Sequence, residues 1–377
     1  MLVEIAWIVV QAVIVFAAST FLFDIVHYFL HAWENSRVPL LREFSRWHDV
    51  HHQFLDKNMD VHPEFVRQNF WFHLLPEYAT SMLGTVVFAF FFSWWAIALV
   101  ALGHTALFVA RIIEEGRDFN HMSMDRLSGT PGFWLVTPSY HALHHVHPHA
   151  FYSSFLNFFD LIAGTGCQFI GRRFVVTGAS GSYGAAMVKH LKQLGAEVVM
   201  AKSGVDYSAG DYGRMHPLLE QADVLVLAHG AKSDDCWNAN YRTFVDLIDL
   251  FEEIGRGRLT PPEVWAVGSE AEFHGDFGMA SLRDYAASKR AFAARALGYY
   301  TSKDVIYRHI VPSAFSSKMG PGLISADLAV RWTLFLIRRG FTYVPVTYTG
   351  LALLNYFRFR FFQRTPVVEP AEAPSRG

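Results

Sequence analysis

The sequence predicts a multidomain fold, in which an all-α transmembrane domain is followed by an α/β domain built on a parallel sheet. Of the 377 residues, 52% are hydrophobic and 18% are charged, whereas soluble domains carry roughly 25% charged residues. Fourteen of the 19 histidines precede residue 150. A glycine-rich turn lies between two apolar runs after residue 173. These observations indicate a histidine-rich membrane domain and a second, soluble domain.

Composition excludes several classes of protein. The 32 basic and 34 acidic residues give a net charge of −2, so we expect no nucleic-acid partner. The two cysteines, Cys167 and Cys236, are too few for a disulfide framework or for a metal site built from three or four thiolates.

Two apolar regions are long enough to cross a bilayer. Residues 5–23 carry no charge, and a span requires roughly 20 apolar residues. No basic segment or cleavage site marks this region as a signal peptide. Residues 78–110 also lack charged side chains, and with the residues back to Phe70 they fit two spans that turn around Ser93-Trp94-Trp95. A buried helical core is the alternative.

Basic residues predict the orientation of these spans. They lie between the two apolar regions and after the second one: Arg37, Arg42, Arg46, Lys57, Arg67, Arg111 and Arg117. By the positive-inside rule, residues 32–69 and the chain after about residue 114 face the cytoplasm, and the N-terminus faces outward.

Nine histidines on the predicted cytoplasmic side recur at helical spacing. They are His27, His31, His48, His51, His52, His121, His141, His144 and His145. Side chains three or four residues apart share one helix face, as two ligands of one metal ion must. Imidazole suits iron, zinc and copper, and nine histidines exceed the needs of a single zinc site, so two metal ions are expected. The first 165 residues contain no Glu-x-x-His and no His-Glu-x-x-His, which excludes a carboxylate-rich di-iron bundle and a zincin protease.

The segments HYFLH (27–31), HDVHH (48–52), FNHMSM (119–124) and VTPSYHALHH (136–145) resemble the fatty acid hydroxylase/sterol desaturase superfamily. His62-Pro63 and the series Asn157, Asp160, Gly164-Thr165 extend the resemblance, with Phe159 in place of the usual Trp. The resemblance covers roughly residues 15–165. It implies a di-iron centre that activates O2 to hydroxylate or desaturate a lipid C–H bond, with the nine histidines as ligands and His62 as a tenth.

The chain after residue 171 predicts a strand, a turn, a helix and a second strand. Residues that we expect to line a cofactor site follow the apolar run 174–177: Gly178, Ser180, Gly181, Tyr183 and Gly184. Glycines let the backbone approach a pyrophosphate at a helix N-terminus, so a Rossmann-like NAD(P)-binding domain is predicted. An α/β unit without a nucleotide is the alternative. Lys202 after the second run, Val198–Ala201, favours NADP(H) over NAD(H).

Tyr285 and Lys289 share one face of a predicted helix, where the ammonium would stabilise a phenolate. Ser269 follows the apolar run 264–267, so we expect it at the carboxyl edge of the sheet. TGASGSYG (177–184), Ser269 and YAASK (285–289) resemble the short-chain dehydrogenase/reductase family. The resemblance implies hydride transfer between NAD(P) and an alcohol or carbonyl, with Tyr285 as acid/base, Lys289 as its partner and ribose ligand, Ser269 as the substrate-oxygen donor and Asn240 in support.

This second half departs from that family in three ways. Ala228-His229-Gly230-Ala231 replaces Asn-Asn-Ala-Gly, the spacing from Ser269 to Tyr285 is long, and the domain is short. An inactive nucleotide-binding domain is therefore an alternative.

Together the two halves resemble the bifunctional sterol desaturase/short-chain dehydrogenase family of bacteria. The resemblance implies an integral protein of the inner membrane with both catalytic centres on the cytoplasmic face. It would oxidise a sterol-like lipid and then interconvert the resulting alcohol and carbonyl. Its partners would be the lipid, O2 and a separate electron donor, either a ferredoxin or a cytochrome. The expected domains are 1–166, 171–340 and 341–377, the last a membrane-interfacial segment with a disordered tail.

Two other functions remain open. The histidine domain could be a metal-holding anchor for an active dehydrogenase, or both sites could be inactive in a lipid-binding regulatory protein. The identity of the lipid, and hydroxylation as against desaturation, also stay open.

Overall fold

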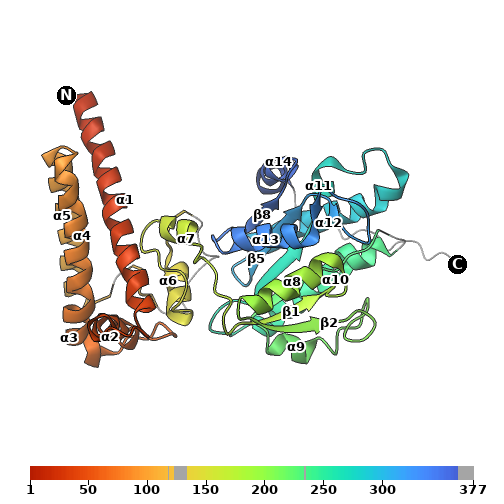
Figure 1. Ribbon diagram of the computed structural model, residues 1–377, viewed down its shortest axis with the longest axis horizontal. Helices are drawn as coiled ribbons and strands as arrows, with labels where there is room; N and C mark the ends of the chain where they lie inside the picture. The colour runs from red at the N-terminus through yellow and green to blue at the C-terminus, as the bar shows by residue number, and fades with distance from the viewer. Residues whose placement is uncertain (118, 123–133, 233–234, 364–377) are drawn as a thin grey trace. The chain divides into compact units, whose positions relative to one another are not determined.

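A computed structural model describes residues 1–117, 119–122, 134–232 and 235–363, and the chain divides into two compact units (Figure 1). The helical unit comprises residues 1–168 and 338–340, and the sheet unit comprises residues 169–337 and the chain from Phe341 onward. The expected disordered tail, 369–377, lies outside the described residues.

The helical unit contains no strand among its described residues. Its helices are α1 (Leu2–Ala32), α2 (Pro39–Phe54), α3 (Val66–Asn69), α4 (Leu75–Val87), α5 (Trp94–Ile113), α6 (Pro138–Val146) and α7 (Phe158–Ala163). Single 3-10 turns at Pro63–Phe65 and Phe88–Phe90 and a π-turn at Phe70–Leu74 join several of them. Helix α1 packs against both α4 and α5. The prediction of an all-α N-terminal half is confirmed.

Two of these helices, α1 and α5, are long and apolar enough to cross a membrane. Helix α5 begins directly after Ser93, whose side chain accepts a hydrogen bond from Trp95 N. Trp94 and Trp95 are 73% and 75% exposed at this turn, a location typical of tryptophans at a membrane interface. The turn between the apolar helices therefore lies where the sequence predicts it.

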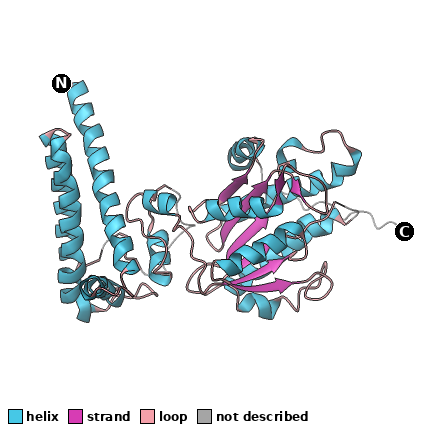
Figure 2. Ribbon diagram, in the orientation of Figure 1, coloured by secondary structure: helices cyan, strands magenta, loops and turns pink. Residues whose placement is uncertain are grey.

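The sheet unit is built on six parallel strands in the order β2-β1-β3-β4-β5-β8. The strands are β1 (Arg173–Thr177), β2 (Glu197–Ala201), β3 (Val224–Leu227), β4 (Glu263–Val267), β5 (Ile306–Pro312) and β8 (Tyr343–Val346), and two short strands, β6 (Phe315–Ser316) and β7 (Ile324–Ser325), pair separately. The main helices are α8 (Ser182–Gln193), α9 (His216–Glu220), α10 (Thr243–Gly255), α11 (Ala271–His274), α12 (Arg283–Tyr300), α13 (Ala326–Ile337) and α14 (Leu351–Phe357). Figure 2 shows helices on both faces of this sheet, which confirms the predicted α/β fold.

Strand order reverses between β1 and β3, which creates a switch point at their carboxyl ends. Ligands of open parallel sheets bind at such points. The six-stranded dinucleotide-binding order has another strand outside β2. Here residues 202–215 and the short helix α9 connect β2 to β3 instead, so the first half of the sheet is one strand shorter.

The segment 341–362 differs from the prediction of a membrane-interfacial element. Its first part forms β8, which pairs with β5 from His309–Tyr343 to Pro312–Val346. Phe359, in the turn that follows α14, is fully buried and stacks on His309. The first part of the segment and Phe359 therefore complete the sheet and its core, whereas other apolar residues stay more than half exposed: Leu353, Leu354, Phe357, Phe361 and Phe362.

Candidate functional site

Four parts of the helical unit bring its histidines together. Helix α1 carries His27 and His31, α2 carries His48, His51 and His52, α6 carries His141, His144 and His145, and the segment 119–122 carries His121. Within each helix the spacing of three or four residues places the rings on one face. The convergence of the helices then brings the faces together.

The histidines form two groups of four. The first histidine group is His27, His31, His48 and His144, and the second is His51, His121, His141 and His145. Within each group the ligand nitrogens lie within 4.8 Å of one another. His27 Nε2 lies 3.0 Å from His144 Nε2, and His141 Nε2 lies 3.1 Å from His145 Nε2. Nitrogens about 2.1 Å from a common ion at roughly right angles are about 3 Å apart, so each group has the dimensions of one metal site.

Two further histidines contact these groups without belonging to either: His52, which the sequence predicts as a ligand, and His73. The centre of the His52 ring lies 5.1 Å from that of His31 and 4.7 Å from that of His145, which places it between the groups. His73 stacks on His51 with ring centres 3.7 Å apart and an angle of 10° between the planes. The sequence carried no sign of this role, because His73 lies in an apolar run without a second histidine at helical spacing.

His62 lies in neither group, contrary to the expectation of a tenth ligand. Its side chain is 40% exposed, with Nε2 3.4 Å from Asp56 Oδ2 and Nδ1 3.7 Å from Glu64 Oε1. These nearby carboxylates hold the imidazole at the surface of the unit. The prediction for His62 is therefore corrected.

The donor atoms of the groups fit metal ions. His48 Nε2 and His145 Nδ1 are buried and find no hydrogen-bond partner among the described residues. Burial lowers the pKa of His48 and His145 well below the usual value, and neighbouring imidazoles lower it further. Burial likewise lowers the pKa of His52 to about 3. The rings are therefore neutral near pH 7, and neutral imidazole is the form that binds metals.

The outer nitrogens of the first group are held by backbone carbonyls. His27 Nδ1 lies 3.0 Å from Tyr152 O, and His144 Nδ1 lies 2.8 Å from Ala150 O. Such contacts select the tautomer that leaves Nε2 for a metal. The carboxylate of Asp160 in turn accepts hydrogen bonds from Tyr152 N at 3.0 Å and from the Tyr140 hydroxyl at 2.7 Å. Asp160 therefore orders the loop that orients the ligands.

The sheet unit places its glycine-rich turn at the switch point between β1 and β3. Gly178 has φ +67°, and a Cβ there would lie 2.5 Å from His229 N. A Cβ on Gly184 would lie 2.2 Å from Gly178 O. The N-terminus of α8 follows, with no side-chain cap from Gly181. A close backbone turn beside first-turn N–H groups fits a pyrophosphate.

Of the other residues predicted to contact the cofactor, some are exposed and one is buried. Ser180 and Lys202 are exposed beside this edge of the sheet. Tyr183 is buried, and its hydroxyl lies 2.6 Å from Thr333 Oγ1, so it packs α8 against α13. Asp206 Oδ2 accepts a hydrogen bond from Lys202 N at 2.7 Å, which places a carboxylate that the sequence had not singled out near the basic residue.

Three predicted catalytic residues meet in the sheet unit. Burial raises the pKa of Tyr285, and the neighbouring Ser269 side chain lowers it by a smaller amount. Lys289 Nζ donates to Val267 O at 2.8 Å, and burial lowers the pKa of Lys289 to about 8 although Glu272 opposes the shift. The expectation that Lys289 lowers the Tyr285 pKa is not met, because burial outweighs any such effect.

Asn240 supports the loop after β3 from a buried position. Its Nδ2 donates to Ala231 O at 2.8 Å and to Ser288 Oγ at 3.1 Å, and its Oδ1 accepts from Ala231 N at 3.1 Å. Asn240 therefore holds the loop against helix α12, which carries Tyr285 and Lys289.

A buried acid–histidine pair lies behind Ser269, and the sequence analysis did not identify it. Glu272 Oε1 accepts a hydrogen bond from Ser269 N at 3.0 Å, while Glu272 Oε2 lies 3.0 Å from His309 Nε2. Tyr307 OH lies 3.0 Å from His309 Nδ1. Glu272 and His309 are 2% and 0% exposed. Their separation in sequence left no short motif that could have revealed the pair.

The sheet order and the glycine turn define a Rossmann-like unit that carries Ser269, Tyr285 and Lys289, and the same chain contains a helical unit with two histidine groups. No protein-family model matches the chain. The chain is similar to the monoglucosyldiacylglycerol epimerase of Synechocystis sp. (strain PCC 6803), with 25% identity over 394 residues that cover 90% of this chain and 93% of the relative.

Solved structures also resemble part of the chain. A short-chain dehydrogenase from Burkholderia cenocepacia J2315 in complex with NADP is 17% identical, with a TM-score of 0.41 over 51% of this chain and 94% of that one. A short-chain dehydrogenase from Sphingobium yanoikuyae in complex with NADPH is 15% identical, with a TM-score of 0.40 over 53% and 99%.

These comparisons overturn the expected membership in the fatty acid hydroxylase/sterol desaturase superfamily and in the bifunctional sterol desaturase/short-chain dehydrogenase family. No family model supports it, and the relative that matches nearly the whole chain bears the name of an epimerase. Histidine spacing reflects the geometry that any helical metal site requires, so the short motifs were a poor guide to ancestry.

Proposed function

We propose that the protein is a membrane-bound, NAD(P)-dependent oxidoreductase that acts on a hydroxyl of a glycolipid sugar, with epimerisation of that carbon as the net result. The name of the Synechocystis relative supports a glycolipid substrate. Helices α1 and α5 support a membrane location. The single observation that carries the proposal is the placement of the Ser269 side chain next to the buried Tyr285, on the helix that also carries Lys289.

The proposed reaction conserves electrons. A nicotinamide dinucleotide, when bound, would supply the acceptor and later the donor of one hydride. Tyr285, in its phenolate form, would accept the proton of the sugar hydroxyl as the C–H bond breaks to give a ketone, and Ser269 would donate a hydrogen bond to the substrate oxygen. Return of the hydride to the opposite face of the ketone, with the proton from Tyr285, would give the epimer and restore both partners.

The residues of the sheet unit support this chemistry in distinct ways. The glycine turn and α8 would hold the pyrophosphate, and Lys289 would bind the ribose hydroxyls. Lys202 favours NADP(H), whereas the neighbouring Asp206 is the residue type that suits the ribose of NAD(H). We therefore infer a nicotinamide cofactor. The Kd values for NAD+ and NADP+ would show whether its ribose carries a 2′-phosphate.

The helical unit is proposed to hold two metal ions and to anchor the chain. The two histidine groups would bind one ion each, and iron is among the metals that imidazole suits. The basic residues predict that both sites face the cytoplasm. In this arrangement the helical unit concentrates the lipid substrate in the membrane.

A second candidate function follows from the two neutral histidine groups themselves. Two irons there would supply O2 activation for hydroxylation or desaturation of a lipid C–H bond, with electrons from a separate ferredoxin or cytochrome. The dehydrogenase residues would then interconvert the new alcohol and its carbonyl. The eight converging imidazoles favour this candidate, whereas the name of the relative favours epimerisation.

One experiment separates the two candidates. The full chain in lipid nanodiscs is incubated with monoglucosyldiacylglycerol and NAD+ or NADP+, with and without O2. The epimerase proposal predicts a lipid of unchanged mass and altered sugar configuration, formed without O2 and lost in Tyr285→Phe. A product heavier by one oxygen or lighter by two hydrogens, formed only with O2 and an electron donor, would establish the second candidate instead.

A further inference from the structure

A cleft of about 570 Å³ opens on the helical unit beside α5. Pockets that bind small molecules usually span roughly 300–1,000 Å³ and are largely apolar. Six of its eleven lining residues are apolar: Leu107, Ala110, Phe119, Leu135, Val136 and Phe155. The other five are polar or charged: Arg111, Glu114, Arg117, Asn120 and Ser154. Leu107 and Ala110 belong to a helix that can cross a membrane, so a lipid in the bilayer would reach these side chains without passing through water.

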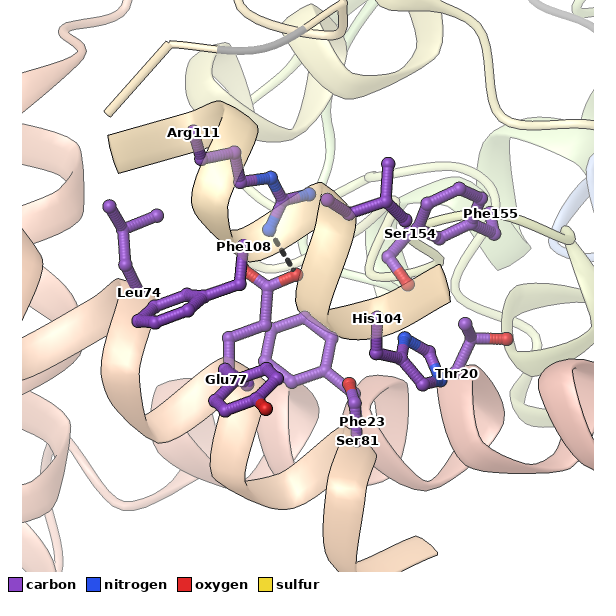
Figure 3. Close-up of a pocket in the computed structure, with 12 residues that line it drawn as sticks. Thr20, Phe23, Leu74, Glu77, Ser81, His104, Phe108, Arg111, Ser154 and Phe155 are labelled. Carbon is purple, nitrogen blue, oxygen red and sulfur yellow. Dashed lines mark ion pairs between the residues drawn. The ribbon is translucent and has the colours of Figure 1, made fainter. Parts of the chain in front are cut away.

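Arg111, one of the residues that line the cleft, forms a half-hidden ion pair with Glu77, which lies behind it. Arg111 Nη1 is 2.6 Å from Glu77 Oε1, and the two side chains are 17% and 12% exposed (Figure 3). Arg111 lines the cleft and also two cavities of about 30 Å³ each. One of these reaches His104, and the other reaches His48 and His51. Arg111 therefore lies between the cleft and a small cavity that histidines of both groups line.

The charges of this pair indicate a neutral polar ligand. Glu77 balances Arg111, so the pair offers hydrogen-bond donors and acceptors without net charge. A sugar hydroxyl both donates and accepts, whereas a phosphate would have to compete with Glu77 for the guanidinium. Asn120 adds an amide to the lining of the cleft. Glu114 and Arg117, which also line the cleft, carry opposite charges, so the cleft with Glu77 behind Arg111 has no net charge and matches a lipid with an uncharged sugar headgroup.

We propose that this cleft is the glycolipid-binding site of the helical unit, with the glycerolipid chains along Leu107 and Val136 and the hexose hydroxyls on Asn120 and on Arg111, whose charge Glu77 balances from behind. The proposal rests on the glycolipid substrate of the proposed function and identifies where the lipid binds. Neither residue of the ion pair belongs to the histidine groups or to the dehydrogenase site.

Native mass spectrometry of the full chain tests the proposal without any turnover. The probes are monoglucosyldiacylglycerol, diacylglycerol and phosphatidylglycerol with identical acyl chains. Leu107→Trp fills the cleft, and Leu99→Trp on the same helix, where Leu99 is 50% exposed, is its matched control. The double variant Glu77→Gln/Arg111→Gln removes both charges together, and Arg67→Gln controls for loss of an exposed charge. Bound metal per chain reports that each variant is folded.

The wild-type chain should retain the glucolipid about tenfold better than either other lipid, since several hydrogen bonds to charged groups are gained. Leu107→Trp should bind the glucolipid about tenfold more weakly than the wild type, whereas Leu99→Trp should bind it normally. The double variant should lose the preference for the glucolipid over diacylglycerol but still bind diacylglycerol. Equal retention of all three lipids, or equal effects of the two tryptophan variants, would overturn the site. Normal binding without any conversion of the bound lipid would refute the proposed function and leave this site in place.

Discussion

His27 Nε2 lies 3.0 Å from His144 Nε2, although the two residues are 117 positions apart in the chain. Helices α1 and α6 bring them together, and each ring is oriented through its other nitrogen by a backbone carbonyl. Two unprotonated nitrogens this close would repel each other through their lone pairs unless a cation lay between them. The contact is therefore the clearest structural indication that the helical unit could hold a metal ion.

Alanine at His48 should remove one metal site. The purified chain should carry about two metal ions, and His48→Ala about one, because a four-histidine group would lose one of its ligands. Metal content is measured by plasma mass spectrometry after growth with added iron. His62→Ala is the control, since His62 lies outside both groups. Equal metal loss in both variants would contradict the assignment.

Cofactor affinity should weaken as the pH rises through about 8. Burial lowers the pKa of Lys289 to about 8, so its ammonium is present below that pH and is lost above it. Because the ammonium is expected to bind the ribose, the Kd for NAD(P) should rise between about pH 7 and 9. Titration calorimetry checks this. Lys289→Arg, whose side chain stays charged, should flatten the dependence, and an unchanged pH profile in that variant would be inconsistent with the role of Lys289.

Glu272 should act as a positioning residue for Ser269. Glu272→Gln weakens the contact to His309, so Ser269 should shift and kcat should fall about ten- to a hundredfold with little change in KM. Glu270→Gln is a matched control, because Glu270 is equally buried but accepts a hydrogen bond from Thr349 at 2.7 Å. If Glu272→Gln changed the thermal stability but not kcat, Glu272 would have only a structural role and would not position Ser269.

Glu263 should contribute to stability above about pH 4.5 and lose this contribution in acid. Burial raises its pKa, but Arg308 and Arg172 outweigh burial and lower it to about 2. Because the folded-state pKa is depressed, stability should fall as the pH drops from about 4.5 to 2. Glu263→Gln should lose about 3 kcal/mol near neutral pH, because it leaves the arginines without their buried anion, and should lack the acid slope. Fluorescence of Trp265, which donates to Glu263 at 2.7 Å, follows unfolding in both proteins.

The sequence predicted the parts of the fold that depend on local pattern. Apolar runs at 174–177, 198–201, 225–227 and 264–267 correspond to β1 to β4, because a buried parallel strand reads as a continuous apolar run. Strand β8 was missed. Its apolar residues are followed by arginines, and only its pairing with β5 distinguishes it from a membrane-surface segment.

In the candidate sites, too, local spacing was predictable and tertiary contacts were not. Spacing within a helix predicted which histidines share a face, but it contained no information on which helices meet, so neither the division into two groups nor the contact of His73 could be predicted. The Glu272–His309 pair joins α11 to β5 and depends entirely on tertiary structure. Family membership was inferred wrongly because the motifs report ligand geometry rather than descent.

The central claim, hydride transfer at a sugar carbon, is tested most directly by an isotope. Monoglucosyldiacylglycerol deuterated at the ring carbons is given to the cofactor-loaded full chain in water, and the product is analysed by NMR. Slower conversion with deuterium retained at the inverted carbon is the predicted result, since the hydride leaves and returns within one site. Conversion with that deuterium replaced by solvent hydrogen would contradict the account.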